Sequence, residues 1–306
     1  MEQQKHFIKD IEIKNFKCFK DFKADGFGRV NLIGGKNNVG KTAFMEACYI
    51  NRQYTSQAIA DIIFSRHLIN LFDELLKEVG IKYILNFINH KAKDIVGGEV
   101  ISNLGISEIK YFENELKNEK ILSNIIYFDT NIQSNKRYDE WYSIIIENGI
   151  EDNVDKLIQI FDTNIDKFRI IKSQPKCRKK DDKKYYNLNE FGDGIAKIIS
   201  FICLLLAKKK SIVFIDEIEN GIHYTNLDEL WRIILTISKE QNVQVFATTH
   251  SDECIESYAR VAKSLEDEEI TFIELGKNKK DEIRAMVYPY EWFIDEIEQN
   301  HEVRGW

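Results

Sequence analysis

A glycine-rich run near the N-terminus has the residue types and spacing of a phosphate-binding loop. Residues 35–42 read Gly-Lys-Asn-Asn-Val-Gly-Lys-Thr, a G-x-x-x-x-G-K-T pattern, after the apolar stretch 30–33 and before the helix-like stretch 43–51. Such glycines let successive N–H groups face phosphate oxygens, and the following helix presents its positive end to the same anion. We expect Lys41 to reach the β- and γ-phosphates of a nucleotide and the Thr42 hydroxyl to ligate Mg²⁺. The alternative is a glycine turn with an accidental lysine, which the strand, loop and helix order disfavours. The predicted nucleotide-binding residues are Gly35, Asn37, Asn38, Gly40, Lys41 and Thr42.

A second candidate group follows an apolar stretch in the C-terminal half. Residues 212–215 are all apolar and are followed directly by Asp216 and Glu217. This run predicts a buried strand neighbouring the strand of the glycine-rich loop, and parallel α/β sheets place ligands at the carboxyl ends of their strands. We expect Asp216 to hold Mg²⁺ with Thr42, and Glu217 to polarise the attacking water and accept its proton. Without the glycine-rich loop, an acidic loop capping the next helix would be the preferred interpretation.

A histidine marks the end of another predicted strand. Residues 243–247 are mostly apolar and lead into Thr248-Thr249-His250-Ser251. Because this strand should end at the same sheet edge, His250 is expected within reach of the γ-phosphate. A lone histidine is more often structural, but its place at a strand end favours a catalytic, phosphate-sensing role.

These candidate residues need a parallel sheet to bring them together, and the C-terminal half has the pattern of one. A strongly apolar helix is expected after Gly192-Asp193-Gly194. The later predicted elements alternate between helix and strand, with helices at 227–238 and 252–263 and strands at 243–247 and 270–275. This alternation predicts an α/β fold with a mostly parallel core sheet.

The N-terminal half is expected to add an antiparallel hairpin and a helical insertion. Apolar residues alternate between 7 and 22, as in two short strands joined near Asn15. From 57 to 89 they recur every three or four residues, which predicts two or three helices, whereas 100–119 is ambiguous between strand and helix. Because the glycine-rich loop precedes this stretch and the metal carboxylate follows it, we expect one domain over residues 1–306. Residues 52–123 would be a helical lateral subdomain inserted in it.

Composition narrows the class of protein. The 306 residues include 43 Lys and Arg against 50 Asp and Glu, a net charge of −7 that excludes a generally basic nucleic-acid-coating protein. Five scattered cysteines without C-x-x-C spacing fit a reducing compartment. The most apolar stretch, 195–207, is too short to span a bilayer, and the chain opens without a signal-peptide pattern. We therefore expect a cytoplasmic protein without membrane contact. The basic run 176–184 is expected to be a solvated hairpin tip or loop, with nucleic-acid contact as the alternative.

The order of these motifs resembles that of ABC-type ATPases of the RecF, SMC and OLD group. The likeness is strongest to the stand-alone OLD-like ATPases of bacterial anti-phage defence. It rests on residues 35–42, the opening hairpin around 11–19, the acidic segment 216–223, and 248–251. It implies one ABC-type ATPase domain that binds ATP and Mg²⁺ and hydrolyses ATP.

The resemblance also implies a homodimer or higher homo-oligomer. Each ATP would lie between the glycine-rich loop of one subunit and the signature helix of the other. The signature falls on Phe191-Gly192-Asp193-Gly194, which departs from the usual Leu-Ser-Gly-Gly by lacking the serine. The contact would then rest on backbone N–H groups of Gly192, Asp193 and Gly194. Gln133, after a strand expected at 124–128, is the candidate metal-sensing glutamine.

Chain lengths discriminate among the relatives. About 175 residues separate Lys41 from Asp216, too few for SMC coiled-coil arms, and the 56 residues after His250 are too few for a TOPRIM nuclease domain. The resemblance thus favours an ATPase that regulates a separate effector protein, a nuclease or toxin, in anti-phage defence. A RecF-like DNA-binding ATPase of DNA repair is the alternative. A transporter nucleotide-binding subunit is disfavoured by the opening hairpin and the non-transporter signature.

Overall fold

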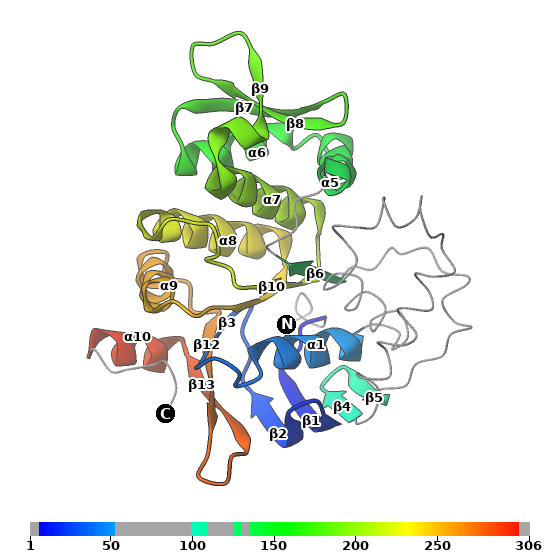
Figure 1. The fold of residues 1–306 in the computed structure, drawn as a ribbon, viewed down its shortest axis with the longest axis vertical. Helices are drawn as coiled ribbons and strands as arrows, with labels where there is room; N and C mark the ends of the chain where they lie inside the picture. Colours follow the sequence, from blue (N-terminus) through cyan, green and yellow to red (C-terminus); the bar gives the residue numbers. More distant parts are fainter. Residues whose placement is uncertain (1–5, 53–98, 109–124, 130–134, 300–306) are drawn as a thin grey trace.

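The computed structural model describes residues 6–52, 99–108, 125–129 and 135–299 (Figure 1). These residues form three sheets. A central six-stranded sheet has the order β13-β12-β3-β11-β10-β6, an N-terminal sheet the order β2-β1-β4-β5, and a smaller sheet the order β7-β8-β9. The mixed α/β architecture confirms the fold class expected from the sequence.

The central sheet carries the candidate residues. Its strands are β3 (Val30–Gly34), β6 (Ile125–Asp129), β10 (Ile212–Asp216), β11 (Gln244–Thr248), β12 (Ile270–Lys277) and β13 (Ile283–Pro289). Five of them run parallel, and β13 is antiparallel to β12. In register, Ile215 lies opposite Ala247 and Thr248 lies opposite Ile33, so β10, β11 and β3 end at one edge. The mostly parallel core is therefore confirmed, while β13 was not predicted.

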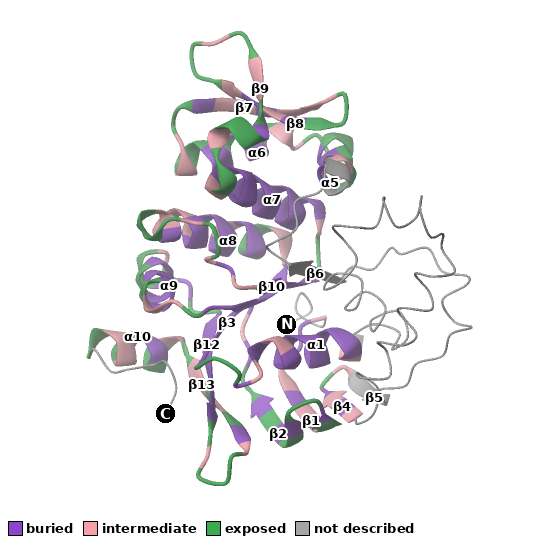
Figure 2. Ribbon diagram, viewed as in Figure 1, coloured by how far each residue is buried: buried purple, intermediate pink, exposed green. Residues whose placement is uncertain are grey.

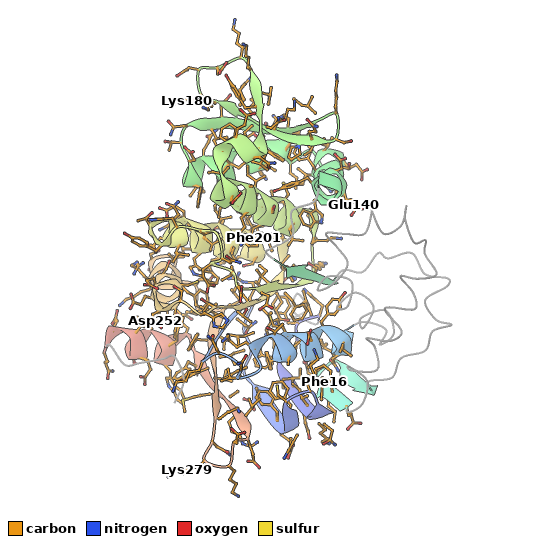
Figure 3. All side chains as sticks on the ribbon, viewed as in Figure 1. Phe16, Glu140, Lys180, Phe201, Asp252 and Lys279 are labelled. Carbon is orange, nitrogen blue, oxygen red and sulfur yellow. The ribbon has the colours of Figure 1, made fainter. Side chains whose placement is uncertain are left out.

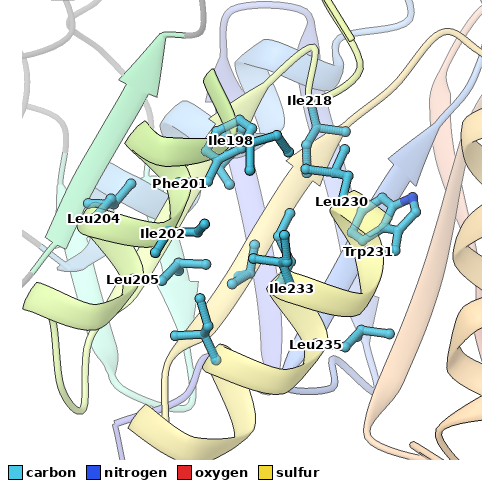
Figure 4. Packing of buried hydrophobic residues seen from close by; sticks show 14 of the residues in the cluster. Ile198, Phe201, Ile202, Leu204, Leu205, Ile218, Leu230, Trp231, Ile233 and Leu235 are labelled. Atoms are coloured by element: carbon cyan, nitrogen blue, oxygen red, sulfur yellow. The ribbon is translucent and has the colours of Figure 1, made fainter. Parts of the chain in front are cut away.

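Helices cover one face of this sheet. They are α7 (Asp193–Ala207), α8 (Leu227–Gln241), α9 (Asp252–Ser264) and α10 (Tyr290–Glu298). Side chains such as Phe201 and Ile202 of α7 and Leu230 and Ile233 of α8 pack together in one buried cluster (Figure 4). Every residue of α7 from Ile195 onward is buried, as Figure 2 shows in purple. A helix that is apolar all round must be covered on all sides.

The side of α7 that faces away from the central sheet is covered by a lobe, which consists of two helices and the smaller sheet. Its elements are α5 (Asn135–Glu147), α6 (Glu151–Phe161), β7 (Ile165–Ile171), β8 (Gln174–Lys179) and β9 (Tyr185–Asn187). Both helices contact α7. The basic run 176–184 is partly strand, because 176–179 belong to β8 and only 180–184 form the turn. No helix within the described parts of the chain is long and apolar enough to cross a membrane.

The opposite face of the central sheet is covered by α1 and the N-terminal sheet. These elements are β1 (Asp10–Phe16), β2 (Phe19–Asp25), α1 (Lys41–Arg52), β4 (Glu99–Ser102) and β5 (Gly105–Glu108). The predicted opening hairpin is present, with its turn at 17–18. Helix α1 packs between the two sheets, where Phe44 contacts Phe22, Phe27 and Phe246.

The expected helical insertion 52–123 is wrong for part of its range. Residues 99–108 form β4 and β5, and β4 pairs with β1 to extend the N-terminal sheet. Val100, a residue of β4, is fully buried in the hydrophobic cluster that this sheet shares with α1. Because the buried and partly buried residues of β4 alternate, this part of the range has the period of a strand and not that of a helix. Residues 53–98 and 109–124 lie outside the described residues.

Candidate functional site

The glycine-rich loop adopts a backbone that suits few residue types. Gly35 has φ 137°, Asn38 φ 62° and Gly40 φ 94°. A Cβ atom at Gly35 would lie 2.4 Å from the Leu275 carbonyl oxygen, so the loop can pass β12 only with glycine there. Helix α1 then begins at Lys41 and presents its N-terminus to the space enclosed by the loop.

Lys41 is the charged centre of the loop. Its side chain is buried, and Nζ donates to the carbonyl oxygens of Gly35 at 2.6 Å and Lys36 at 3.1 Å. Burial lowers the pKa of Lys41 to about 8, against the opposing influence of Asp216 and other nearby carboxylates. The ammonium is therefore still mostly protonated at pH 7. A buried cation whose partners are neutral groups is ready to bind an anionic phosphate.

The strand order changes one expectation about the metal site. Strand β11 stands between β3 and β10, so the strand of Asp216 is not the immediate neighbour of the loop strand. Thr248, at the end of β11, bridges this gap. Its Oγ1 donates to Asp216 Oδ1 at 2.5 Å and accepts from the backbone N–H of Glu217 at 2.8 Å. Thr42 Oγ1 lies 3.5 Å from the same Asp216 oxygen.

The oxygens of Thr42 and Asp216 fit a magnesium ion. Mg²⁺ prefers oxygen ligands and is commonly held by one or two protein groups together with substrate phosphates. Among the described residues, no cluster of three or more His, Cys, Asp and Glu could hold a metal unaided. With one carboxylate and one hydroxyl, such a site would bind Mg²⁺ together with the phosphates of a nucleotide. The structure places Asp129, at the end of β6, in register with Asp216, but Gln133 lies outside the described residues.

His250 connects the loop lysine with the acidic segment. Its Nδ1 lies 3.2 Å from Lys41 Nζ, and its Nε2 lies 3.7 Å from Glu217 Oε1. The side chains of His250 and Glu217 are 38% and 45% exposed, so solvent water reaches both. The backbone N–H of His250 donates to Glu219 Oε1 at 2.8 Å. The structure thus brings Lys41, Thr42, Asp216, Glu217 and His250 together at one sheet edge.

Sequence reasoning assigned no role to three residues that shape this region. Thr248 orients Asp216, Glu219 fixes the backbone of His250, and buried Lys197 of α7 donates to the Asn220 carbonyl oxygen. Two features of the sequence could have pointed to Thr248 and Lys197. A hydroxyl residue ends a buried strand at Thr248, and a lone lysine interrupts an apolar helix at Lys197.

The predicted signature residues form a separate surface at the start of α7. Gly192 has φ 90° and open space around it, and Gly194 lies near the Gly221 carbonyl oxygen. A pocket of about 340 Å³ opens here. No residue of the glycine-rich loop lines this pocket. Its lining residues are Phe161, Asp162, Phe191, Gly194, Ile195, Gly221, His223 and Asn226. The N-terminus of α7 is thus presented on a surface of its own rather than to the loop of the same chain.

Gly35→Ala should damage both folding and ATP binding. The added methyl group would meet the Leu275 carbonyl, whereas Gly149, also at positive φ, has nothing within 4 Å of a built Cβ. Gly149→Ala should therefore cost only the backbone strain of about 1 kcal/mol. Gly35→Ala should cost more and weaken ATP binding at least about tenfold. Urea unfolding and titration calorimetry measure both quantities, and equal behaviour of the two variants would contradict the steric argument.

Comparison with known proteins supports a nucleotide hydrolase. The family described as AAA ATPase domain matches residues 103–255, half of the chain, starting after the glycine-rich loop. An "ATP/GTP phosphatase" of Helicobacter pylori is 24% identical over 327 residues, covering 84% of this chain and 88% of that protein. An uncharacterized protein of Methanocaldococcus jannaschii is 31% identical over 72 residues, 24% of this chain and 28% of that protein.

Solved structures share the fold at low sequence identity. An Smc head bound to the C-winged helix domain of ScpA has a TM-score of 0.55 and 13% identity, over 93% of this chain and 99% of that chain. The cbiO1 protein of Clostridium perfringens, part of an ABC transporter complex, has a TM-score of 0.50 and 12% identity, over 96% and 93%. The fold is therefore that of Smc heads and ABC ATPases. The match of the family model to half of the chain shows that the chain belongs to the AAA ATPase domain family and is an ATPase.

Proposed function

We propose that this chain is a Mg²⁺-dependent ATPase that dimerises around ATP and thereby regulates a separate effector protein, a nuclease or toxin, in bacterial anti-phage defence. The observation that carries the nucleotide part is the cluster at the end of β3, β11 and β10. There Lys41 Nζ lies 3.2 Å from His250, and Asp216 faces both Thr42 and Thr248. The effector part is supported by the motif resemblance to OLD-like ATPases.

The residues of the cluster divide the work of phosphoanhydride hydrolysis. The loop N–H groups and the start of α1 hold the phosphates, and Lys41 moves from the carbonyls of Gly35 and Lys36 to the β- and γ-phosphates. Thr42 and Asp216 would hold Mg²⁺, and the bound ion would neutralise part of the negative charge of the phosphates. Glu217 accepts a proton from the attacking water, so that ATP and water give ADP and phosphate. His250 donates a hydrogen bond to the γ-phosphate.

A second subunit would complete the site. Glu217 and His250 remain partly exposed on the γ-phosphate side, and a single described chain presents its α7 N-terminus in a different pocket. A partner's α7 laid over the nucleotide would add N–H groups near Gly192 and Gly194 and exclude water. The lower local dielectric would strengthen every contact to the phosphates.

Mixing two inactive variants tests this arrangement. Lys41→Ala removes the loop cation, and Gly194→Asp places a negative charge on the surface that would face the partner's γ-phosphate. Random pairing makes half of the dimers heterodimers with one intact composite site each, so ATPase activity should recover to about a quarter of the wild-type value.

The matched control combines Lys41→Ala with Glu217→Gln. Each substitution disables the ATP site that contains the glycine-rich loop of the same chain. Both sites of a heterodimer are then disabled, so this mixture should stay inactive. An absence of recovery in the first mixture, together with a monomer by light scattering of Glu217→Gln in Mg²⁺ and ATP, would exclude the dimer model.

A further inference from the structure

We propose that the β7-β8-β9 sheet and its 180–184 turn bind nucleic acid through the phosphodiester backbone. This region lies at the far end of the molecule from the N-terminal sheet (Figure 1). Residues 165–191 contain nine Lys and Arg but only four Asp and Glu, in a chain whose net charge is −7. We define the basic surface by the seven lysines of this region: Lys167, Lys172, Lys176, Lys179, Lys180, Lys183 and Lys184.

The lysines of the basic surface are not held in ion pairs within the described residues. The two arginines of the region are used in structural pairs, Arg169 with Asp155 and Arg178 with Asp166. By contrast, none of the seven lysines forms an ion pair with a carboxylate of the described residues. The acidic groups nearby have other tasks: Asp182 accepts from the Tyr186 hydroxyl, and Glu190 accepts from the Asn187 backbone.

Strand alternation directs part of this charge away from the protein core. Phe168 and Cys177 lie opposite each other and are fully buried, so the residues beside them in each strand belong to the other face. That face carries Lys167 and Lys176. The remaining lysines extend the charge to the two turns of the sheet, and Lys180 projects at the outer tip, whereas Glu140 lies on α5 (Figure 3). Residues 135–164 of the lobe contain seven Asp and Glu against three Lys and Arg, so the excess of positive charge lies on residues 165–191, where Asp181 and Asp182 share the turn with Lys180 and Lys183.

Aromatic rings are interleaved with these cations. The Arg178 guanidinium lies 5.7 Å from the Tyr185 ring centre, and Lys179 Nζ lies 5.4 Å from the ring of Tyr186 and 5.7 Å from that of Phe191. Cations beside partly exposed rings suit nucleic acid, because phosphates contact the cations and bases stack on rings.

A membrane surface fits less well. Among the described residues, the exposed large hydrophobic side chains are Ile146, Ile160, Tyr224, Met286 and Trp292. All five lie outside β7, β8, β9 and their turns. A basic surface without an apolar anchor would hold lipid weakly. We therefore assign nucleic acid as the occupant.

The inference goes beyond the ATPase proposal and stands on different residues. The basic surface includes none of Lys41, Asp216 or Glu217, so Lys41→Ala should bind nucleic acid like the wild type. A loss of ATPase function and a loss of nucleic-acid binding are thereby separable.

Fluorescence anisotropy with the full chain tests the proposal. The probes are labelled single-stranded DNA, duplex DNA and single-stranded RNA of one sequence, at about 50 and 200 mM salt, with poly-glutamate as the acidic-protein control and anionic vesicles as the membrane control. We expect saturable binding of at least one nucleic acid that weakens about 10- to 100-fold between the two salt concentrations, as for about two to four phosphate contacts. Lys176→Glu, Lys180→Glu and Lys183→Glu in one chain should weaken it at least about tenfold.

The matched control reverses the same number of exposed lysines elsewhere. Lys209→Glu, Lys210→Glu and Lys239→Glu change the net charge equally and should alter binding less than about twofold. Unchanged thermal unfolding and basal ATPase activity show that both triple variants are folded. Equal losses in the two triple variants, absence of saturable nucleic-acid binding, or equally tight binding of poly-glutamate or vesicles would each overturn the proposal.

Discussion

Glu217→Gln is expected to slow ATP hydrolysis by about 10²- to 10⁴-fold while ATP binding persists. Glutamine keeps the size of the side chain and its approach to His250, but it cannot accept the proton of the attacking water. The position is held independently of the side chain, because the Glu217 backbone N–H donates to Thr248 Oγ1. The variant should therefore accumulate ATP-bound dimers.

Single-turnover hydrolysis and light scattering with ATP measure these two effects. Glu240→Gln, which removes an exposed carboxylate at the end of α8, is the matched control and should keep wild-type rates. If Glu217→Gln hydrolysed ATP as fast as Glu240→Gln, the proton acceptor would have to be another group, with His250 as the next candidate.

Lys41→Ala is expected to weaken ATP binding by about 10²- to 10⁴-fold. Each hydrogen bond between a charged donor and a phosphate contributes about 1.5–3 kcal/mol, and the lysine is positioned to make two such bonds. The loss should exceed any effect on folding, because Lys41 in the free protein is a buried cation whose pKa is already lowered to about 8.

Lys36→Ala is the matched control, since Lys36 is an exposed lysine of the same loop. Calorimetric titration with ATP and Mg²⁺ should show near wild-type affinity for Lys36→Ala, and thermal unfolding should show both variants folded. If Lys41→Ala bound ATP with undiminished affinity, the assignment of the phosphate site to this loop would be wrong.

Much of the fold and the candidate site could be predicted from local patterns. The spacing of Gly35, Gly40 and Lys41 is written within eight residues, and the apolar runs before Asp216 and His250 indicate where buried strands end. Parallel strands bring such ends to one edge of the sheet, so a common site for Lys41, Asp216 and His250 could be predicted, whereas their contact depends on β3, β11 and β10 being neighbours. The same reasoning gave the opening hairpin and the alternating helices and strands of the C-terminal half.

Only the tertiary structure decided which distant segments lie side by side. Insertion of β11 between β3 and β10 makes Thr248 the bridge to Asp216, and the pairing of β4 with β1 turns part of the expected helical insertion into sheet. Lys197 finds the Asn220 carbonyl oxygen only because α7 packs beside the segment after β10. The physical reason is that periodicity records which face of an element is buried, whereas strand order and buried polar contacts depend on pairing between residues far apart in the chain.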